Sequence, residues 1–94
     1  MKAAVLFNPS PQWVKKFPNL ARDIRDFNGF EKEIFPVNRS EPDSLETQLA
    51  KILGGSFDSI AIAGGDGSLN RTVNFLQGRR ALERSTLAMI PFGT

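Results

Sequence analysis

The sequence contains no cysteine and no histidine. These absences exclude a disulfide framework, a zinc site built from Cys and His, and a cysteine or Ser-His nucleophile within these residues. The polar groups that remain are carboxylates, hydroxyls, amides and backbone N–H groups. Such groups suit the binding of phosphate and of hard cations such as Mg²⁺, so we expect any chemistry to be of that kind.

Long apolar segments and basic runs are also missing. No window approaches the roughly 20 apolar residues that a membrane-spanning helix needs. The apolar run Ala3–Phe7 is too short for the core of a signal peptide, and we therefore expect a cytoplasmic protein. The 12 basic and 10 acidic residues are mixed along the chain. Without a basic stripe interleaved with aromatic residues, we expect no nucleic-acid partner.

Four short apolar runs alternate with three patterns of helical spacing. The expected strands are residues 3–7, 30–37, 58–63 and 87–90, and the expected helices carry apolar residues within 13–27, 45–53 and 69–76. Pro18 predicts a start or a kink in the first helix, and Asn28 with Gly29 predicts its end. The second run alternates imperfectly, which favours a strand near a sheet edge. The alternation of strands and helices predicts an α/β fold with a parallel sheet and right-handed crossovers, without giving the strand order.

A glycine-rich turn, Gly64–Ser68, follows the buried run 58–63 and precedes a helix. Glycines let a backbone approach a phosphate closely, and we expect some of them at positive φ. The free N–H groups and the dipole of the following helix favour an anion there. We expect Ser68 to cap the helix, to bind a phosphate oxygen, or both. The alternative is that the glycines serve only tight packing.

Asp66 is an unusual residue in a phosphate cradle because its carboxylate repels the ligand unless a cation intervenes. It therefore indicates a magnesium ion that bridges Asp66, directly or through water, to phosphate oxygens. The alternative is that Asp66 caps the helix that begins near Ser68.

Other polar turn residues follow the remaining predicted strands. Asn8 and Ser10 follow the first, Ser40 follows the second, and Thr94 follows the fourth. The carboxyl ends of parallel strands lie at one edge of a sheet, where ligands of open α/β folds bind. We therefore expect these residues to converge with Gly64–Ser68 on one cleft.

Three motifs together resemble the diacylglycerol kinase catalytic domain family, which includes bacterial lipid kinases and sphingosine kinases. The first is Ala63–Asn70 followed by Val73, Asn74 and Leu76, the second is Phe7–Ser10, and the third is Ile90–Thr94. The resemblance implies a three-layer nucleotide-binding domain similar to the N-terminal domains of phosphofructokinase and NAD kinase. It also implies that residues 1–94 are an incomplete N-terminal ATP-binding domain. The C-terminal β-rich domain, with the lipid pocket and the catalytic base, is expected to be missing.

The resemblance further implies that Mg-ATP binds in the cleft and that its γ-phosphate passes to a diacylglycerol-like lipid hydroxyl. Magnesium is expected near Asp66. The residues carried over to the nucleotide site by matching position are Asn8, Ser40, Gly64, Gly65, Asp66, Gly67, Ser68, Leu69, Asn70 and Thr94. The implied partners are the nucleotide and, through the missing domain, a lipid substrate. Peripheral membrane contact and homo-oligomer formation through exposed apolar surface remain open.

Three residues depart from the family pattern. Pro11 and Phe75 replace glycines, and Arg71 replaces a glutamate and is expected to oppose the helix dipole in the first turn. We expect the isolated 94 residues to be inactive as a kinase, because they offer no convincing catalytic base. Two alternatives stay open: a fragment of an NAD kinase-like enzyme, and a non-catalytic module that binds nucleotide or self-associates.

Overall fold

The strands form a single parallel sheet in the computed structural model, which describes residues 2–27, 29–81 and 86–91. They are β1 (Lys2–Phe7), β2 (Glu31–Pro36), β3 (Ser59–Gly64) and β4 (Leu87–Pro91). Their order is β2-β1-β3-β4. The alternation of strands and helices along the sequence predicts this parallel sheet, and the imperfect pattern of β2 predicts its edge position.

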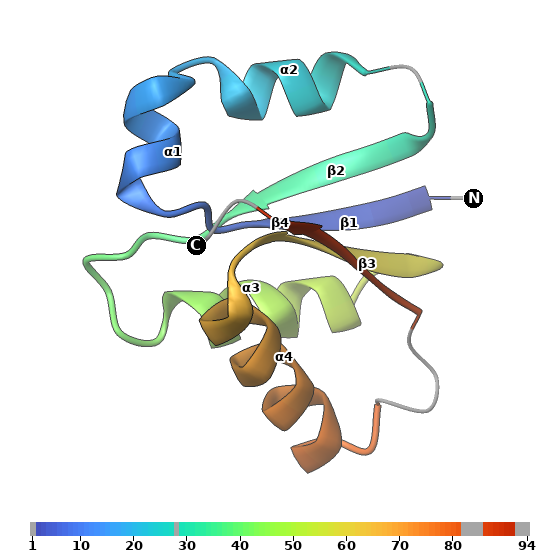
Figure 1. Cartoon of the computed structure of the whole chain (residues 1–94). Helices are drawn as coiled ribbons and strands as arrows, with labels where there is room; N and C mark the ends of the chain where they lie inside the picture. Colours follow the sequence, from blue (N-terminus) through green and yellow to red (C-terminus); the bar gives the residue numbers. More distant parts are fainter. Residues whose placement is uncertain (1, 28, 82–85, 92–94) are drawn as a thin grey trace.

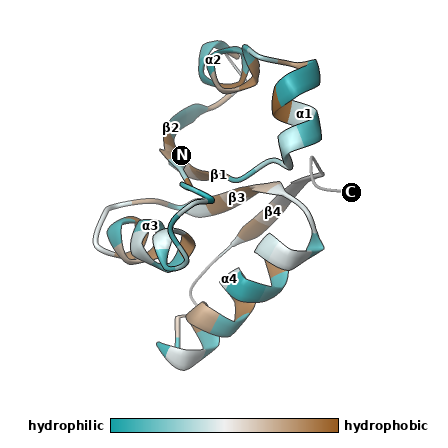
Figure 2. Ribbon diagram, turned by 90° about the vertical axis from the view of Figure 1, so that its left-hand side faces the viewer, coloured by the Kyte–Doolittle hydropathy of each residue, from teal (hydrophilic) through white to brown (hydrophobic). Residues whose placement is uncertain are grey.

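Helices cover both faces of the sheet. They are α1 (Pro11–Lys16), α2 (Leu20–Asp26), α3 (Ser44–Leu53) and α4 (Asp66–Gly78). Figures 1 and 2 show α1 and α2 on one face and α3 and α4 on the other. The expected three-layer α/β fold is therefore confirmed. None of the helices in the described part of the chain has both the length and the apolar character that crossing a membrane requires.

The two central strands bury side chains on both faces, which explains their continuous apolar runs. Ala4, Leu6, Ile60 and Ile62 belong to the larger core cluster, together with residues of α3 and α4. The alternate residues Val5, Ala61 and Ala63 form a smaller cluster, against which Phe7, Ile24 and Ile34 pack. Most of the core therefore lies between the sheet and the α3–α4 layer.

The segment expected as one helix over 13–27 forms two short helices. Pro18 lies in the break between α1 and α2, because proline lacks the N–H that a continuous helix needs. Neither helix has a buried residue, and Val14 and Phe27 are 45% and 60% exposed. The expected apolar face of a single helix is therefore wrong. Asn28, expected to end that helix, lies outside the described residues.

The helix expected to carry the apolar residues within 45–53 is present as α3. Its apolar positions Leu45, Leu49 and Ile52 are buried, and Gly54 is its C-cap. Asp43 is the N-cap residue, but its side chain forms no capping hydrogen bond. This helix is therefore stabilised by the packing of its apolar stripe in the core rather than by a capping side chain, since most helix stability in proteins comes from tertiary contacts.

The buried stripe of α4 is partly polar. Ser68, Thr72 and Leu76, spaced four residues apart, are its buried residues, whereas the expected Leu69, Val73 and Phe75 are only half-buried. Thr72 is fully buried, and its Oγ1 donates to the carbonyl oxygen of Ser68 over 2.7 Å. That bond satisfies the hydroxyl inside the core. Small polar residues thus let the start of α4 pack closely against the sheet.

Candidate phosphate-binding site

The carboxyl ends of β1 and β3 are joined where the glycine-rich turn begins. The N–H of Asn8 donates to the carbonyl oxygen of Ala63 over 2.7 Å. A Cβ atom on Gly64 would lie 2.8 Å from the carbonyl oxygen of Asn8 and 2.9 Å from Oγ of Ser68. Gly64 is therefore needed for close approach. No described glycine has a positive φ, so the expectation of left-handed glycines is wrong.

Helix α4 begins two residues earlier than expected. Gly65 is its N-cap, in an extended conformation, and Asp66, Gly67 and Ser68 form the first helical turn. No side chain caps this helix start, so capping by Ser68 is wrong, and Asp66 is the first helical residue rather than the cap. The first N–H groups of an α-helix have no acceptor within the helix. They are the donors that an anion at this turn would use.

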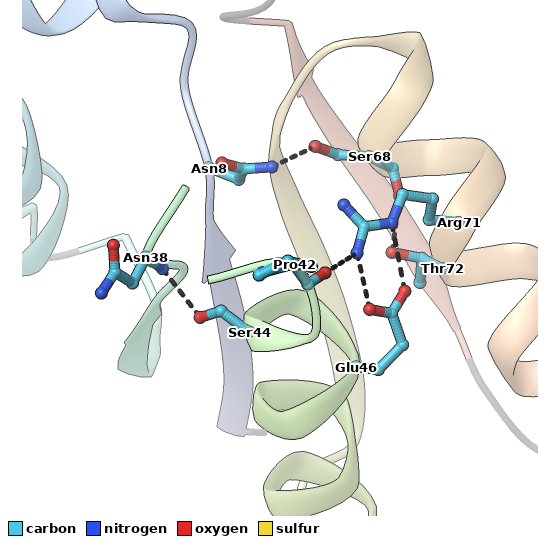
Figure 3. A network of polar contacts seen from close by, with 8 residues as sticks. All are labelled: Asn8, Asn38, Pro42, Ser44, Glu46, Ser68, Arg71 and Thr72. Atoms are coloured by element: carbon cyan, nitrogen blue, oxygen red, sulfur yellow. Dashed lines mark hydrogen bonds and ion pairs between the residues drawn. The ribbon is translucent and has the colours of Figure 1, made fainter. Parts of the chain in front are cut away.

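A buried hydrogen bond links the turn after β1 to the first turn of α4. Nδ2 of Asn8 donates to Oγ of Ser68 over 2.8 Å (Figure 3). Asn8 is only 7% exposed, and its Oδ1 is buried without a partner among the described residues. Two segments singled out from the sequence are thus in direct contact, and one polar atom of Asn8 remains for a further partner.

A polar pocket of about 270 Å³ lies at this edge of the sheet. Its lining residues are Asn8, Arg39, Gly65, Asp66, Gly67, Ser68 and Arg71. The pocket therefore brings together most of the glycine-rich turn and the first residue after β1. It also contains two arginines that the sequence did not identify as site residues.

The described residues predicted for the site that do not line this pocket are Ser40, Gly64, Leu69 and Asn70. Ser40 is exposed, and its hydroxyl donates to Oδ1 of Asn38 over 2.7 Å. Leu69 is half-buried and packs against the main core, and Asn70 is exposed on α4. Thr94 lies outside the described residues. The roles of Ser40, Gly64, Leu69, Asn70 and Thr94 in nucleotide binding stay predictions.

Arg39 holds the chain where it leaves β1. Its Nε donates to the carbonyl oxygen of Pro9, and its Nη2 donates to that of Asn8, each over 3.1 Å. Arg39 follows closely after the end of β2, and this position at the carboxyl edge of the sheet could have identified it as a site residue. The family resemblance implies a contact at Ser40 in this turn instead.

Arg71 forms a two-pronged ion pair with Glu46 of α3. Nη2 and Nε donate to the two carboxylate oxygens over 2.6 and 3.1 Å, and Nη2 also donates to the carbonyl oxygen of Pro42 over 2.9 Å. These hydrogen bonds from Arg71 lower the pKa of Glu46 below its usual value. Because α4 begins at Asp66, Arg71 lies in the second turn, and the expected conflict with the helix dipole is wrong.

The other two departures from the family pattern fit the packing. Pro11 is the first residue of α1, a position that favours proline because its N–H would have no acceptor there. Phe75 packs against the main core, and the guanidinium carbon of Arg79 lies 3.9 Å from its ring centroid. Neither residue lines the pocket within the described chain.

A magnesium ion is compatible with this pocket only as a site shared with phosphate. Asp66 is the one carboxylate among the described lining residues, and it is exposed. The described residues contain no group of three His, Cys, Asp or Glu side chains that could enclose a metal. Magnesium often binds proteins through one or two carboxylates and completes its shell with substrate phosphates and water. The donor set therefore fits a phosphate-bridged ion.

A second hollow, of about 340 Å³, lies beside α2 and is lined by Asp23, Ile24, Phe27 and Phe30. Its surface is almost entirely apolar, and none of these four lining residues carries a positive charge. The pocket at the start of α4 is therefore the better candidate for an anionic ligand.

One of the three comparisons with known proteins found a match. The family model described as the diacylglycerol kinase catalytic domain matches residues 2–94. No curated protein and no solved structure matches the chain significantly.

Proposed function

Because the chain belongs to the diacylglycerol kinase catalytic domain family, we propose that its pocket binds the phosphates of ATP for transfer to a lipid hydroxyl. One observation carries the proposal. The Asn8–Ser68 hydrogen bond joins two of the motifs on which the family resemblance rests, and it does so beside a polar pocket at a helix start.

The first turn of α4 supplies the main phosphate contacts. Its free N–H groups and the positive end of the helix dipole attract phosphate oxygens. Nothing lies within 4 Å of the place that a Cβ of Gly67 would occupy, so the space beside the turn is open. Asn8 and Ser68 hold the turn in place from β1. Precise positioning of this kind is a large part of catalysis in phosphoryl transfer.

Asp66 is the residue we propose for magnesium. When bound, Mg²⁺ supplies neutralisation of the negative charge on the phosphates. Asp66 would hold the ion from the first turn of α4, and its carboxylate would then no longer repel the nucleotide. Replacement of Asp66 by Asn should therefore weaken binding of Mg-ATP but not binding of ATP in EDTA.

The acceptor we propose is a diacylglycerol-like lipid. Phosphoryl transfer also needs a base for the attacking hydroxyl, and none of the pocket residues is assigned to that role because Asp66 is used near the phosphates. We propose that the 94-residue chain binds Mg-ATP and transfers negligible phosphate by itself. The contacts predicted for Ser40, Leu69, Asn70 and Thr94 remain part of the proposed nucleotide site.

Titration of the ¹⁵N-labelled chain with Mg-ATP, followed by amide NMR, tests this proposal. We expect the largest shifts at Asn8 and Gly65–Ser68, and shifts at Ser40, Asn70 and Thr94 if these contacts exist. AMP, which lacks the β- and γ-phosphates, should cause much smaller shifts at the turn. Millimolar nucleotide detects sites with a binding free energy of only about 4 kcal/mol.

An unshifted spectrum of the folded chain at millimolar Mg-ATP would contradict the proposal and favour the non-catalytic, self-associating module. Labelled ATP incubated with a longer form of the protein that carries the expected C-terminal domain, and with either NAD or diacylglycerol, checks the other alternative. Transfer of label to NAD would identify an NAD kinase-like activity.

A further inference from the structure

We propose that Arg39 and Arg71 bind the phosphate chain of the nucleotide, and that Glu46 positions Arg71 for this contact. The inference rests on the proposed nucleotide site, because both arginines line the same pocket as Asp66 and the first turn of α4. It adds residues that lie outside the glycine-rich motif, one of them at a position where the family resemblance leads us to expect a glutamate.

Arg71 is held through one edge of its guanidinium group. Nε and Nη2 are bonded to Glu46 and Pro42, whereas no bond from Nη1 is found among the described residues. Figure 3 shows the third guanidinium nitrogen on the side of the Asn8–Ser68 bond, away from Glu46. The two N–H groups of Nη1 are thus available to a ligand in the pocket.

Arg39 has the same arrangement. Its Nε and Nη2 donate to the carbonyl oxygens of Pro9 and Asn8, and no bond from Nη1 is found in the described part of the chain. Both arginines are therefore fixed before a ligand arrives. A fixed guanidinium loses less conformational entropy when it binds phosphate than a freely moving one does.

A third group in the pocket also lacks a partner. Asn8 is more than nine-tenths buried, and Oδ1 of its amide has no hydrogen bond within the described residues. Rotation of the amide by 180° would exchange its atoms, with Ser68 donating to Oδ1 and Nδ2 becoming the group without a partner. In both orientations a buried polar group of the pocket needs a ligand atom, because an unpaired buried polar group is costly.

The arginines of the pocket favour a polyphosphate even without metal. The lining residues in the described chain carry two positive charges, Arg39 and Arg71, against one negative charge, Asp66. Glu46 lies outside the lining and offsets part of the charge of Arg71, whose Nη1 has no bond among the described residues. A glutamate at position 71 would remove one positive charge, add a negative one and lose the ion pair with Glu46. We therefore expect this chain to keep measurable polyphosphate affinity when magnesium is removed.

Isothermal titration calorimetry with tripolyphosphate in EDTA, and separately with Mg-ATP, tests the inference. Arg39→Gln and Arg71→Gln should each weaken tripolyphosphate binding about tenfold, equivalent to about 1.4 kcal/mol. Arg22→Gln removes the same charge from α2, outside the pocket, and is the matched control. Both pocket arginines are exposed, so we expect these variants to fold, which circular dichroism can verify.

The positioning role of Glu46 needs a separate measurement. Glu46→Gln should weaken tripolyphosphate binding several-fold in the wild-type chain and have no effect in the Arg71→Gln chain. The Nε–H signal of Arg71 in the NMR spectrum should shift or broaden in the Glu46→Gln variant. An equal effect of Glu46→Gln in both backgrounds would mean that Glu46 does not act through Arg71.

The outcomes separate this inference from the proposed function. If the wild type binds Mg-ATP and both arginine variants bind tripolyphosphate and Mg-ATP as the Arg22→Gln control does, the arginine contacts are wrong and the nucleotide site stands. If the wild type binds neither tripolyphosphate nor Mg-ATP, both proposals are wrong. If the wild type binds tripolyphosphate through the arginines but not ATP, the pocket is an anion site for a different phosphate compound.

Discussion

Gly64 and Gly67 belong to one turn, but the absence of a side chain has different consequences at the two positions. At Gly64 the backbone of Asn8 and the side chain of Ser68 approach closer than a Cβ atom would allow. At Gly67 the corresponding space is open. Only Gly64 is therefore required by packing, and Gly67 is free to vary unless a ligand occupies the space beside it.

This contrast makes a prediction about stability. Gly64→Ala should lower the free energy of unfolding by about 1–3 kcal/mol, the usual cost of an inserted methyl group in a tightly packed site. Gly67→Ala should leave stability unchanged or raise it by up to about 1 kcal/mol, because alanine favours the helical conformation. Urea denaturation of the two variants measures both effects. Equal stabilities would show that the close approach at Gly64 does not constrain this position.

At this scale the sequence predicted the glycine-rich turn and Asn8 as neighbours, and it missed Arg39 and Arg71. The neighbouring positions follow from the sheet topology alone, whereas the roles of the two arginines depend on exact element boundaries, which the sequence defines poorly. A parallel sheet brings all strand ends to one edge whatever their exact last residue. Whether Arg39 or Ser40 faces the pocket depends on the conformation of a short turn, and the role of Arg71 depends on where α4 begins. A shift of one or two residues in an element boundary changes both assignments.

At the scale of elements, the two helical layers hold the sheet unequally. Helices α3 and α4 contribute Leu45, Leu49, Ile52 and Leu76 to the main core. Helices α1 and α2 contribute no buried residue. Apolar periodicity predicted α3 well. It could not predict the Ser68–Thr72–Leu76 stripe of α4, because the pattern of apolar residues alone ignores small polar residues that satisfy their hydrogen bonds locally.

Hydrogen exchange should reveal this inequality. We expect the amides of α1 and α2 to exchange through local opening, much faster than those of β1, β3 and α3, because few buried contacts oppose that opening. Exchange monitored by NMR at neutral pH provides the measurement, with α3 as the internal reference. Equal protection of α2 and α3 would show that the smaller cluster around Val5 and Ala61 holds its layer as firmly as the main core does.

At the scale of the whole molecule, the pocket joins three segments that are distant in sequence. Asn8 follows β1, Arg39 lies between β2 and α3, and Asp66–Ser68 begin α4. The unfolded chain does not hold these groups together. A ligand that contacts all three segments therefore binds only the folded molecule, and binding must stabilise the whole domain.

Thermal unfolding measures this linkage. At a concentration about ten times the dissociation constant, Mg-ATP should add about 1.4 kcal/mol to the free energy of unfolding. For a domain of this size, that corresponds to a rise of roughly 5–10 °C in the melting temperature. AMP at the same concentration is the control and should have little effect. A melting temperature that does not change with Mg-ATP up to 10 mM would exclude useful affinity.

The parallel strand order has a further consequence for how fast the chain folds. In the described part of the chain no strand pairs with its neighbour through a hairpin: Lys2 pairs with Glu31, Ala3 with Ser59, and Ile60 with Leu87. Each pairing must close a long loop before its contacts are gained, and such topologies have high contact order and fold slowly. During synthesis, β1 cannot pair with β3, the other central strand, until β3 has left the ribosome. The pocket at the start of α4 therefore cannot exist in any early folding species, since its formation waits for the slowest pairing, that of β1 with β3.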